Sequence, residues 1–421
     1  MDSMNYLDYV DPGYRTKDHE LTCTYYLEHS KDIDFRWAAG AIAAESSIGT
    51  WTSLSTMKEN IKELAARVYR LDKENNTIKV AYPPEVFEAG NMPQILSSIT
   101  GNIYGLEELR RLRLLDVSFP RDLTEKFLGP NLGINEIKNR VGAKDRPLVG
   151  TIVKPKLGLN SEDHSKVAKK SWKNGLDIVK DDENLTSMQF NEFDERVVKT
   201  LEKKHLVEEK TGEKKLYFPN VTAPVSEMKR RADLVIENGG KYVMIDILTA
   251  GFSSLQEIRD YLEKKDRDIG IHAHRAQHAA YTRLKDHGIS MLSIAKFARL
   301  VGVDNLHSGT VIGKMEGQES EVKRIYSFLR SDWYDKKTTI PVASGGLHPG
   351  LVPKVVELLG RDIVIQAGGG VHGHPSGTEA GSKALRDAAD AVMEGISLNE
   401  KSKKSSELKK ALNKWGPKKS N

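Results

Sequence analysis

A lysine and three acidic residues follow one mostly apolar stretch of the sequence without interruption. The stretch, Leu176–Val179, has the composition of a buried strand, and Lys180, Asp181, Asp182 and Glu183 come directly after it. Because side chains alternate along an extended chain, Lys180 and Asp182 would point to the same side, and Glu183 could turn toward the same centre. Two carboxylates suit a hard cation that takes oxygen ligands, whereas a lysine ammonium does not. Lys180 therefore either forms an ion pair with these acids or has altered chemistry.

Polar residues also gather at the ends of other predicted strands. Two lysines with one residue between them follow the first strand, and two histidines have the same spacing in the fifth. Charged residues at the carboxyl ends of barrel strands are typical of an active site. The candidates are Lys154 and Lys156, then His272, His274 and Arg275, then His307 with Lys314 in the following loop, then Ser344, Gly345 and Gly346, and finally Gly368, Gly369 and Gly370.

The two glycine-rich groups favour phosphate binding. They would follow the seventh and eighth strands, where backbone N–H groups can contact a phosphate. Arg275, His307 and Lys314 would supply cationic donors to another phosphate or to developing negative charge. The sequence therefore predicts a substrate with two phosphates, one on each side of a metal ion held by Asp182 and Glu183.

Each of these motifs also has an ordinary structural explanation. A lysine beside acids is most often a salt bridge, a lone histidine is more often structural than catalytic, and short glycine runs form tight turns. The coincidence of such features at five strand ends on one face disfavours these explanations when they are taken together.

The elements that would position these residues begin near Pro147, where a pattern of strand, loop and helix starts to repeat. Helical segments such as Ser226–Asn238 and Leu351–Leu359 lie between the apolar strands. Eight such units fit a closed (β/α)₈ TIM barrel better than an open doubly wound sheet. The predicted strands are Leu148–Lys154, Leu176–Lys180, Lys215–Asn220, Tyr242–Leu248, Gly270–His274, Asn305–Ser308, Ile340–Ser344 and Ile363–Ala367.

Residues 1–125 are predicted to form a smaller α+β domain of the ferredoxin-like type. Strands and helices mix there without the regular alternation of the barrel, which would occupy residues 126–398. The predicted elements are a strand at Leu21–Leu27, a helix from Asp34 to Glu45, and a hairpin of Arg67–Leu71 and Thr77–Tyr82.

Residues 399–421 form a tail that contains eight lysines. Leu408 and Leu412 have helical spacing, which would give the tail a weakly amphipathic face. We expect a solvated, frayed helix, and a surface for an anionic partner is the alternative.

The totals describe a globular chain without an obvious macromolecular partner. The 421 residues are 38% hydrophobic and 29% charged, and 64 basic residues nearly balance 59 acidic ones. This balance implies no nucleic-acid partner. The single cysteine, Cys23, excludes an intrachain disulfide and a cysteine-based metal site. The sequence shows neither a signal peptide nor an apolar run that could span a membrane, so we expect a cytoplasmic enzyme or binding protein.

Four long motifs of the barrel region and two of the N-terminal region occur together in a known family. They are Gly150–Leu159, Gly175–Asn184, His307–Lys314, Gly368–Pro375, Glu45–Thr52 and Ile99–Gly105. These motifs resemble the large subunit of ribulose-1,5-bisphosphate carboxylase/oxygenase (RuBisCO). The likeness extends over nearly the whole chain, in long and specific stretches.

The resemblance implies an answer to the question of Lys180. In this family the matching lysine reacts with carbon dioxide to form a carbamate, which becomes a third oxygen ligand of Mg²⁺ beside Asp182 and Glu183. The carbamate would then take the C3 proton of ribulose 1,5-bisphosphate to give an enediolate that attacks CO₂ or O₂. Lys154 would protonate the final carbanion, and Lys156 would help to orient it.

The resemblance also implies roles for residues on both sides of the metal. His274 would bind sugar hydroxyls and assist proton transfer, and Lys314 would close over the site and stabilise the carboxylated intermediate. The phosphate groups would lie near two sets of residues, Thr50, Trp51, Gly346, Gly368 and Gly369 on one side, and Arg275, His307 and Ser344 on the other.

Four site residues lie in the N-terminal region and point to an oligomer. In the family, the positions of Glu45, Thr50, Trp51 and Asn102 complete the active site of the neighbouring subunit. The expected active unit is therefore a homodimer or an assembly of dimers. Chain length and the lack of a long C-terminal extension resemble the archaeal form III group, which functions without small subunits and is associated with AMP salvage.

Two other functions remain as alternatives. A RuBisCO-like enolase or isomerase of methionine salvage would use the same metal site, but such relatives lack several second-phosphate and closing-loop residues that this sequence has. A non-catalytic phosphosugar- or nucleic-acid-binding protein would have to explain the intact metal residues, and only the basic tail supports it.

Overall fold

The computed structural model describes residues 5–52, 54–266, 268–313 and 319–416. The chain divides into two compact units, each with its own sheet. The first unit comprises Met1–Leu128 with Gln277–Leu300, and the second comprises Gly129–Ala276 with Val301–Asn421.

The first unit contains a five-stranded sheet in the order β10-β4-β1-β3-β2. Its central strand β1 (Leu21–His29) is antiparallel to β3 (Thr77–Tyr82) on one side and to β4 (Leu109–Ser118) on the other. Alternate residues of β1 are buried, as expected for a strand with one face on a core. The hairpin of β2 (Arg67–Asp72) with β3 confirms the predicted one.

Helix α1 (Phe35–Glu45) begins where the sequence predicts, because Asp34 caps it. The Asp34 carboxylate accepts hydrogen bonds from the backbone N–H groups of Arg36 and Trp37. The small residues of α1 are buried, and Gly40 leaves room for the Tyr6 backbone, since an added Cβ would lie 1.9 Å from the Tyr6 oxygen. The other elements are η1 (Tyr6–Tyr9), α2 (Glu59–Lys62), η2 (Pro84–Val86), α3 (Met92–Thr100), η3 (Asn102–Gly105), α4 (Arg121–Thr124), α11 (His278–Thr282) and α12 (Met291–Val301).

One strand of this sheet was not predicted from the sequence. Strand β10 (Gly288–Ile289) pairs in parallel with β4, and the Tyr104 hydroxyl donates a hydrogen bond to the Gly288 carbonyl over 2.6 Å. A strand of two residues has too few side chains for an alternating pattern, so only its tertiary partner reveals it.

The second unit contains an eight-stranded parallel sheet, which confirms the predicted (β/α)₈ barrel. The strand order is β7-β6-β5-β13-β12-β11-β9-β8. The two ends meet, because the Met244 N–H donates to the Pro219 carbonyl and the Val221 N–H donates to the Met244 carbonyl. The strands are β5 (Leu148–Ile152), β6 (Ile178–Lys180), β7 (Leu216–Phe218), β8 (Tyr242–Asp246), β9 (Gly270–His274), β11 (Asn305–His307), β12 (Ile340–Ser344) and β13 (Val364–Gln366).

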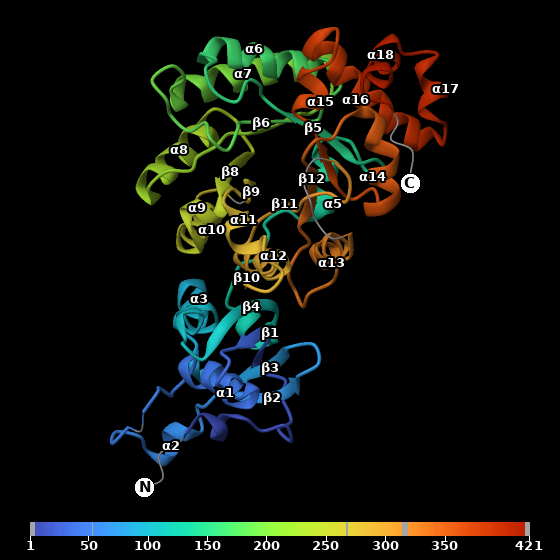
Figure 1. The fold of residues 1–421 in the computed structure, drawn as a ribbon. Coiled ribbons are helices and arrows are strands. Elements are labelled where there is room, and N and C mark those ends of the chain that lie inside the picture. The colour runs from blue at the N-terminus through green and yellow to red at the C-terminus, as the bar shows by residue number, and fades with distance from the viewer. Residues whose placement is uncertain (1–4, 53, 267, 314–318, 417–421) are drawn as a thin grey trace. The chain divides into compact units, whose positions relative to one another are not determined.

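Helices lie outside the barrel strands (Figure 1). Helix α6 (Ser161–Lys173) shows why they begin where they do, since the Asn160 side chain accepts the Asp163 N–H and acidic residues occupy the first turn. The other helices are α5 (Gly133–Arg140), α7 (Phe193–Thr211), α8 (Val225–Glu237), α9 (Ile247–Ala250), α10 (Phe252–Lys265), α13 (Glu319–Arg330), η4 (Pro349–Leu351), α14 (Val352–Leu359), α15 (Gly369–His372), α16 (Gly377–Glu394), α17 (Leu398–Ser402) and α18 (Ser406–Trp415).

The expectation of a solvated, frayed tail is wrong for its described part. Leu408 and Leu412 of α18 are buried in the same apolar cluster as Leu385 of α16. Ser405 caps α18 and also donates a hydrogen bond of 2.6 Å to Asp387. The helix is therefore part of the barrel unit.

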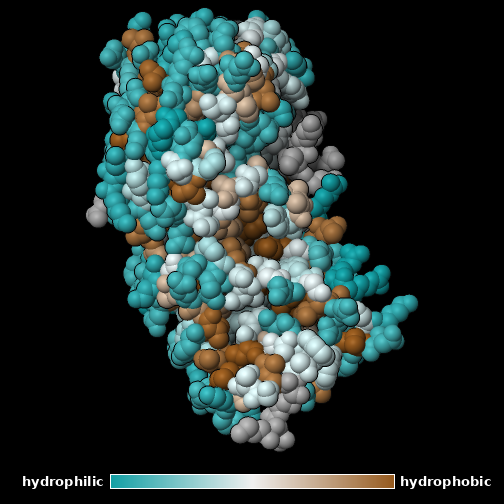
Figure 2. All heavy atoms as spheres, turned by 90° about the vertical axis from the view of Figure 1, so that its left-hand side faces the viewer, coloured by the Kyte–Doolittle hydropathy of each residue, from teal (hydrophilic) through white to brown (hydrophobic). Residues whose placement is uncertain are grey.

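The described residues contain no helix that combines the length and apolar character needed to cross a membrane. On the face drawn in Figure 2, hydrophilic side chains predominate, and hydrophobic ones form small groups among them.

Candidate active site

A cavity of about 680 Å³ opens at the carboxyl ends of the barrel strands. The last residues of β5, β6, β9, β11, β12 and β13, or residues just after them, contribute to its wall, together with the end of α18. Eleven residues that the sequence singled out line it, namely Lys154, Lys180, Glu183, His274, His307, Ser344, Gly345, Gly346, Gly368, Gly369 and Gly370.

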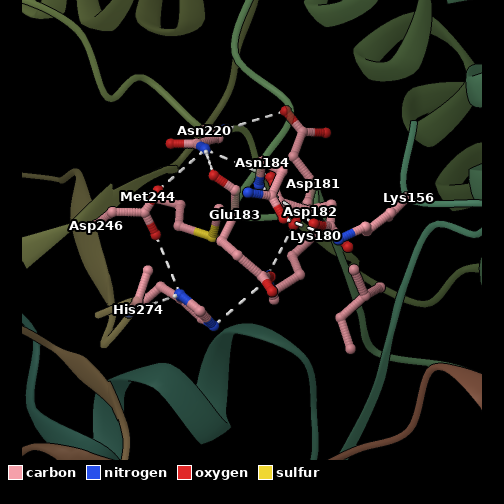
Figure 3. A network of polar contacts seen from close by, with 12 residues as sticks. Lys156, Lys180, Asp181, Asp182, Glu183, Asn184, Asn220, Met244, Asp246 and His274 are labelled. Carbon is pink, nitrogen blue, oxygen red and sulfur yellow. Dashed lines mark hydrogen bonds and ion pairs between the residues drawn. The ribbon is translucent and has the colours of Figure 1, made fainter. Parts of the chain in front are cut away.

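Lys180 is the last residue of β6 and is wholly buried. Its ammonium donates a hydrogen bond to the Asp181 carbonyl over 2.7 Å and lies 3.7 Å from Glu183 Oε2 (Figure 3). Burial lowers the pKa of Lys180 below its ordinary value, against the attraction of the Glu183 and Asp182 charges. The structure thus favours the neutral amine here more than at an exposed lysine.

Of the three acidic residues after Lys180, Asp182 and Glu183 point to one side and Asp181 points to the other. Glu183 lines the cavity and Asp182 contacts Lys154 at its wall. Burial opposes ionisation of Glu183, but the nearby Lys180 charge leaves its pKa lowered. Asp181 points the other way and accepts hydrogen bonds from Arg196 over 3.1 Å and from the Tyr217 hydroxyl over 2.6 Å. Asp181 is therefore a buried structural residue.

The two lysines after β5 differ in their contacts. Lys154 Nζ lies 2.5 Å from Asp182 Oδ2, at the wall of the cavity. Lys156 is exposed, and its nearest polar partner is Asn184 Oδ1 at 3.3 Å. Lys156 does not line the cavity in this structure.

His274, the last residue of β9, approaches the same Glu183 oxygen as Lys180 does. Its Nε2 lies 3.6 Å from Glu183 Oε2, and its Nδ1 lies 3.1 Å from Asp246 Oδ1 (Figure 3). The Asn220 amide lies between Asp246 and the backbone of the acidic loop, Asp181–Glu183. It is 3.2 Å from the Glu183 carbonyl. These contacts join β6, β7, β8 and β9 at one end of the barrel.

Three further basic residues surround His274. His307 packs against the His274 ring with centroids 4.6 Å apart, and burial holds the pKa of His307 well below its ordinary value. His272 is stacked on Phe218 beneath them and does not line the cavity. Arg275 lies against Gly309, since an added Cβ there would be 2.7 Å from the guanidinium, and burial lowers the pKa of Arg275 to about 10.

The glycine-rich loops after β12 and β13 lie side by side. A Cβ added at Gly370 would be 2.2 Å from the Leu347 carbonyl oxygen, so only glycine permits this approach. Gly346 has a φ of 72°, a backbone conformation that L side chains rarely adopt. Gly368 lies next to the Lys154 side chain, at 3.2 Å from its Cε when a Cβ is added. This arrangement exposes backbone groups of both loops to the cavity, as an anion site requires.

The remaining predicted residues are not part of this cavity. Glu45, Thr50, Trp51 and Asn102 belong to the first unit, where the Tyr6 hydroxyl donates to Glu45 over 3.3 Å and Trp51 is 81% exposed. Lys314 lies outside the described residues.

Several cavity residues were not found from the sequence. Lys414 and Trp415 belong to the tail that was expected to be solvated, yet the Trp415 ring is stacked on His348 with centroids 5.6 Å apart. Gln366 lies within the predicted strand Ile363–Ala367 and His348 lies beyond the predicted strand Ile340–Ser344, and neither was singled out beside the glycines. Asp246 and Asn220, which hold the lining residues in place, were hidden inside predicted strands.

The donor atoms at Lys180 fit a magnesium ion only if the lysine changes its charge. Among the residues that the structure describes, no three His, Cys, Asp or Glu side chains converge as a metal site. Asp182 and Glu183 supply two carboxylates, and the third group at the same place is the Lys180 amine. Addition of CO₂ to that amine would supply the missing anionic oxygens, which match the ligand preference of Mg²⁺.

Comparison with known proteins covers both units. The catalytic-domain model of the ribulose bisphosphate carboxylase large chain matches residues 133–415, and the N-terminal-domain model matches residues 8–123. The ribulose bisphosphate carboxylase of Pyrococcus abyssi is 50% identical over 413 residues, which cover 98% of this chain and 97% of that protein.

Two solved structures are similar over almost their whole length. The octameric ribulose-1,5-bisphosphate carboxylase/oxygenase of Pyrococcus horikoshii has a TM-score of 0.96 and 49% identity, and the match covers 100% of this chain and 99% of that one. The dimeric archaeal Rubisco of Hyperthermus butylicus has a TM-score of 0.93 and 43% identity, with coverage of 98% and 99%.

Proposed function

Because the chain belongs to the ribulose bisphosphate carboxylase large-chain family and has the carboxylase activity of that family, we propose that CO₂-modified Lys180 and Mg²⁺ form its catalytic centre. The substrate is ribulose 1,5-bisphosphate, and carboxylation gives two molecules of 3-phosphoglycerate. The complete burial of Lys180 beside two carboxylates is the observation that supports this mechanism most strongly.

Burial prepares Lys180 for reaction with CO₂. A buried ammonium is costly, so the neutral amine is favoured, and only the neutral amine has the lone pair that attacks carbon. The Lys180 nitrogen forms a bond to the carbon of CO₂, and one N–H proton leaves to solvent. The side chain would then carry a negative charge, and together with Asp182 and Glu183 it would supply the oxygen ligands that suit Mg²⁺.

Mg²⁺ held by these three groups would polarise oxygens of the substrate and stabilise the negative charge that develops on them. Lys180, in its modified form, would take the C3 proton of ribulose 1,5-bisphosphate. His274 would bind sugar hydroxyls and assist proton transfer, since its Nε2 faces the same cavity. Lys154 would donate the proton that completes the second product, and Lys156 would help to orient the intermediate.

The phosphates would bind at the two sides of the cavity. The backbone N–H groups of the loops after β12 and β13 would hold one phosphate at Gly346, Gly368 and Gly369, with Gly345 in the same loop. Arg275, His307 and Ser344 would hold the other. Positive charge from Arg275 suits a phosphate, because its guanidinium donates several hydrogen bonds in one plane.

A second subunit would complete the site. Glu45, Thr50, Trp51 and Asn102 would come from the partner in a homodimer or an assembly of dimers, and Lys314 would close over the substrate. The solved relatives named above are octameric and dimeric, which supports a homodimer or an assembly of dimers, and we expect no small subunit. We also propose that the enzyme belongs to the form III group, that it acts in AMP salvage, and that it catalyses a side reaction with O₂.

One assay tests the proposed mechanism. The full-length protein is incubated with CO₂ and Mg²⁺ and then given ribulose 1,5-bisphosphate with ¹⁴C-labelled bicarbonate. We expect acid-stable label in 3-phosphoglycerate, and activity that depends on preincubation with both CO₂ and Mg²⁺. Labelled product without any such dependence would contradict the role of Lys180, and no labelled product would contradict carboxylation itself.

A further inference from the structure

A buried carboxylate outside the cavity lining, Asp246, contacts the His274 ring on the side away from Glu183. Asp246, the last residue of β8, is almost completely buried, and its Oδ1 lies 3.1 Å from His274 Nδ1. The same ring nitrogen also lies 3.2 Å from the Ala276 N–H. These two contacts require different tautomers, because Nδ1 donates to a carboxylate only when it carries a proton and accepts from an N–H only when it does not.

The carboxylate contact decides between the two tautomers. A hydrogen bond to a charged oxygen is about twice as strong as one between neutral groups, so Nδ1–H donation to Asp246 outweighs acceptance from Ala276. Nε2 is then the unprotonated nitrogen of the neutral ring, and it is the nitrogen that faces the cavity. A base or acceptor for a substrate hydroxyl needs this tautomer.

Asn220 holds Asp246 and the acidic loop together. Its Oδ1 accepts the Thr222 N–H over 3.1 Å, which fixes which end of the amide is the donor. Its Nδ2 therefore faces acceptors only, with the Glu183 carbonyl at 3.2 Å, and the Asp182 carbonyl and Asp246 Oδ2 each at 3.4 Å.

These contacts form a closed ring of four residues. It runs from Asn220 to Asp246, from Asp246 to His274, from His274 Nε2 to the Glu183 carboxylate at 3.6 Å, and from the Glu183 carbonyl back to Asn220 (Figure 3). All four side chains come from different strands or strand ends, so no local sequence pattern creates the ring. The ring links His274 to the Asp182–Glu183 segment through contacts on both sides.

We propose that Asp246 and Asn220 are positioning residues of this carboxylase, Asp246 by holding His274 with Nε2 unprotonated toward the cavity, and Asn220 by holding Asp246 and the Asp182–Glu183 backbone together. This inference rests on the proposed function for the use made of His274. The orientation itself can be measured without any turnover.

The tautomer is tested by ¹⁵N NMR of the full-length protein labelled at histidine, with the spectrum of His274→Gln subtracted to identify the His274 signals. We expect a protonated Nδ1 and an unprotonated Nε2 in the wild-type protein. In Asp246→Asn the amide can donate to Nδ1, so the proton should move to Nε2. The same tautomer in both proteins would overturn the role of Asp246, whether or not the protein carboxylates.

Kinetics then test the consequence. Asp246→Asn should lower kcat by about 10- to 100-fold, the range found when a residue that orients a catalytic histidine is lost, with a much smaller change in KM for ribulose 1,5-bisphosphate. The ¹³C NMR signal of the Lys180 carbamate should remain at the same Mg²⁺ concentration. In the His274→Gln background the Asp246→Asn change should have almost no further effect on kcat.

Asp304→Asn is the matched control for a buried aspartate in the barrel. Asp304 accepts the backbone N–H groups of Leu132 and Ile271 at the start of β11, away from the cavity, so this variant should keep the wild-type kcat. Asp246→Glu restores a carboxylate and should recover part of the lost kcat, and it replaces Asp246→Asn if that variant does not fold. The proposal would be overturned if Asp246→Asn lowered kcat as much in the His274→Gln background as in the wild-type background. A wild-type kcat in Asp246→Asn would also overturn it.

Asn220→Asp tests the link to the acidic loop. The change keeps the shape of the side chain but removes the donor and puts an anion beside two carbonyls and Asp246. We expect both a lower kcat and a higher Mg²⁺ concentration for the half-maximal carbamate signal. An unchanged Mg²⁺ dependence would overturn the role of Asn220, and wild-type protein that forms no labelled product would overturn the proposed function instead.

Discussion

Lys154 Nζ and Asp182 Oδ2 lie 2.5 Å apart and join the loops that follow β5 and β6. The two partners differ in access to the cavity, because Asp182 is 1% exposed whereas the Lys154 side chain is 34% exposed. The lysine is therefore the partner that can move toward a substrate, and the aspartate is the partner that stays in place. This asymmetry agrees with a proton donor on one side and a metal ligand on the other.

Lys154→Met should remove the proton donor and leave the metal site. We expect kcat to fall by roughly 100-fold or more, the usual contribution of a positioned acid or base. The ¹³C carbamate signal of Lys180 should persist in the presence of Mg²⁺. Lys166→Met, on the exposed face of α6, is the control and should behave as wild type. Turnover at the wild-type rate would rule out the assigned role of Lys154.

Lys180→Met should abolish both the carbamate signal and carboxylation. The change removes the amine that is proposed to carry the carbamate, so this third anionic ligand cannot form. Lys204→Met is a close control, because Lys204 is also buried on α7 with its pKa lowered by burial but pairs with Glu208 outside the cavity. A carbamate signal that survives in Lys180→Met, measured by ¹³C NMR with labelled CO₂, would contradict the assignment.

Gly346→Ala should weaken phosphate binding. The positive φ of Gly346 costs an alanine about 1–2 kcal/mol, and relief of that strain would turn the loop N–H groups away from the phosphate. Loss of one charged hydrogen bond corresponds to a rise of about tenfold or more in KM for ribulose 1,5-bisphosphate. Gly395→Ala at the end of α16 has a similar φ and open space around it, so it serves as a control for stability alone. Equal KM values in the two variants would argue against a phosphate at this loop.

His372 should make the protein less stable as the pH falls from about 6.5 to about 4. Burial lowers the pKa of His372 to about 4, so the unfolded chain takes up a proton at higher pH than the folded one. The ring lies 2.9 Å from the Ile152 carbonyl and 3.0 Å from the Thr378 hydroxyl. In urea unfolding, His372→Gln should lose less stability over this range than wild type, by at most about 3 kcal/mol. Identical pH profiles would show that His372 is not a source of acid sensitivity.

Leu408→Ala should destabilise the barrel unit by about 2–5 kcal/mol, as is usual for a buried leucine. The loss arises because α18 packs in the same apolar cluster as α14 and α16. Lys409→Ala changes the exposed neighbour and should have little effect on thermal unfolding. A melting temperature equal to that of wild type in Leu408→Ala would mean that the tail is not part of the core.

The residues at strand ends could be predicted because each follows its own local pattern. His274 and His307 each come after a short apolar run, and in a parallel barrel such positions meet at one end whatever their separation in sequence. The barrel order and the position of Lys180 follow from the same rule. The positions of polar residues at the ends of apolar strands therefore predicted most of the cavity lining.

Asn220 and Asp246 could not be predicted because their importance lies in partners far along the chain. Asp246 was read as the interior of a strand that was predicted to reach Leu248, and it pairs with His274 from the next strand. The prediction that Leu408 and Leu412 lie on a solvated helix was wrong for a related reason. Two leucines on a lysine-rich helix form only a weakly amphipathic pattern, and the apolar surface that buries them comes from other segments. Whether a helix face is buried depends on the surface it packs against, and the sequence of the helix alone does not specify that surface.

The parallel pairing of β5 with β13 has a consequence for the synthesis of the protein. Gly150 pairs with Gln366, so the first barrel strand made by the ribosome has no neighbour on that side until the last has emerged. The loop with Lys154 and the glycine loop after β13 can therefore meet only after all eight barrel strands have been synthesised. Premature termination or proteolytic loss before β13 would remove the glycine loop that is proposed to bind a phosphate, so we expect such a chain to lack carboxylase activity.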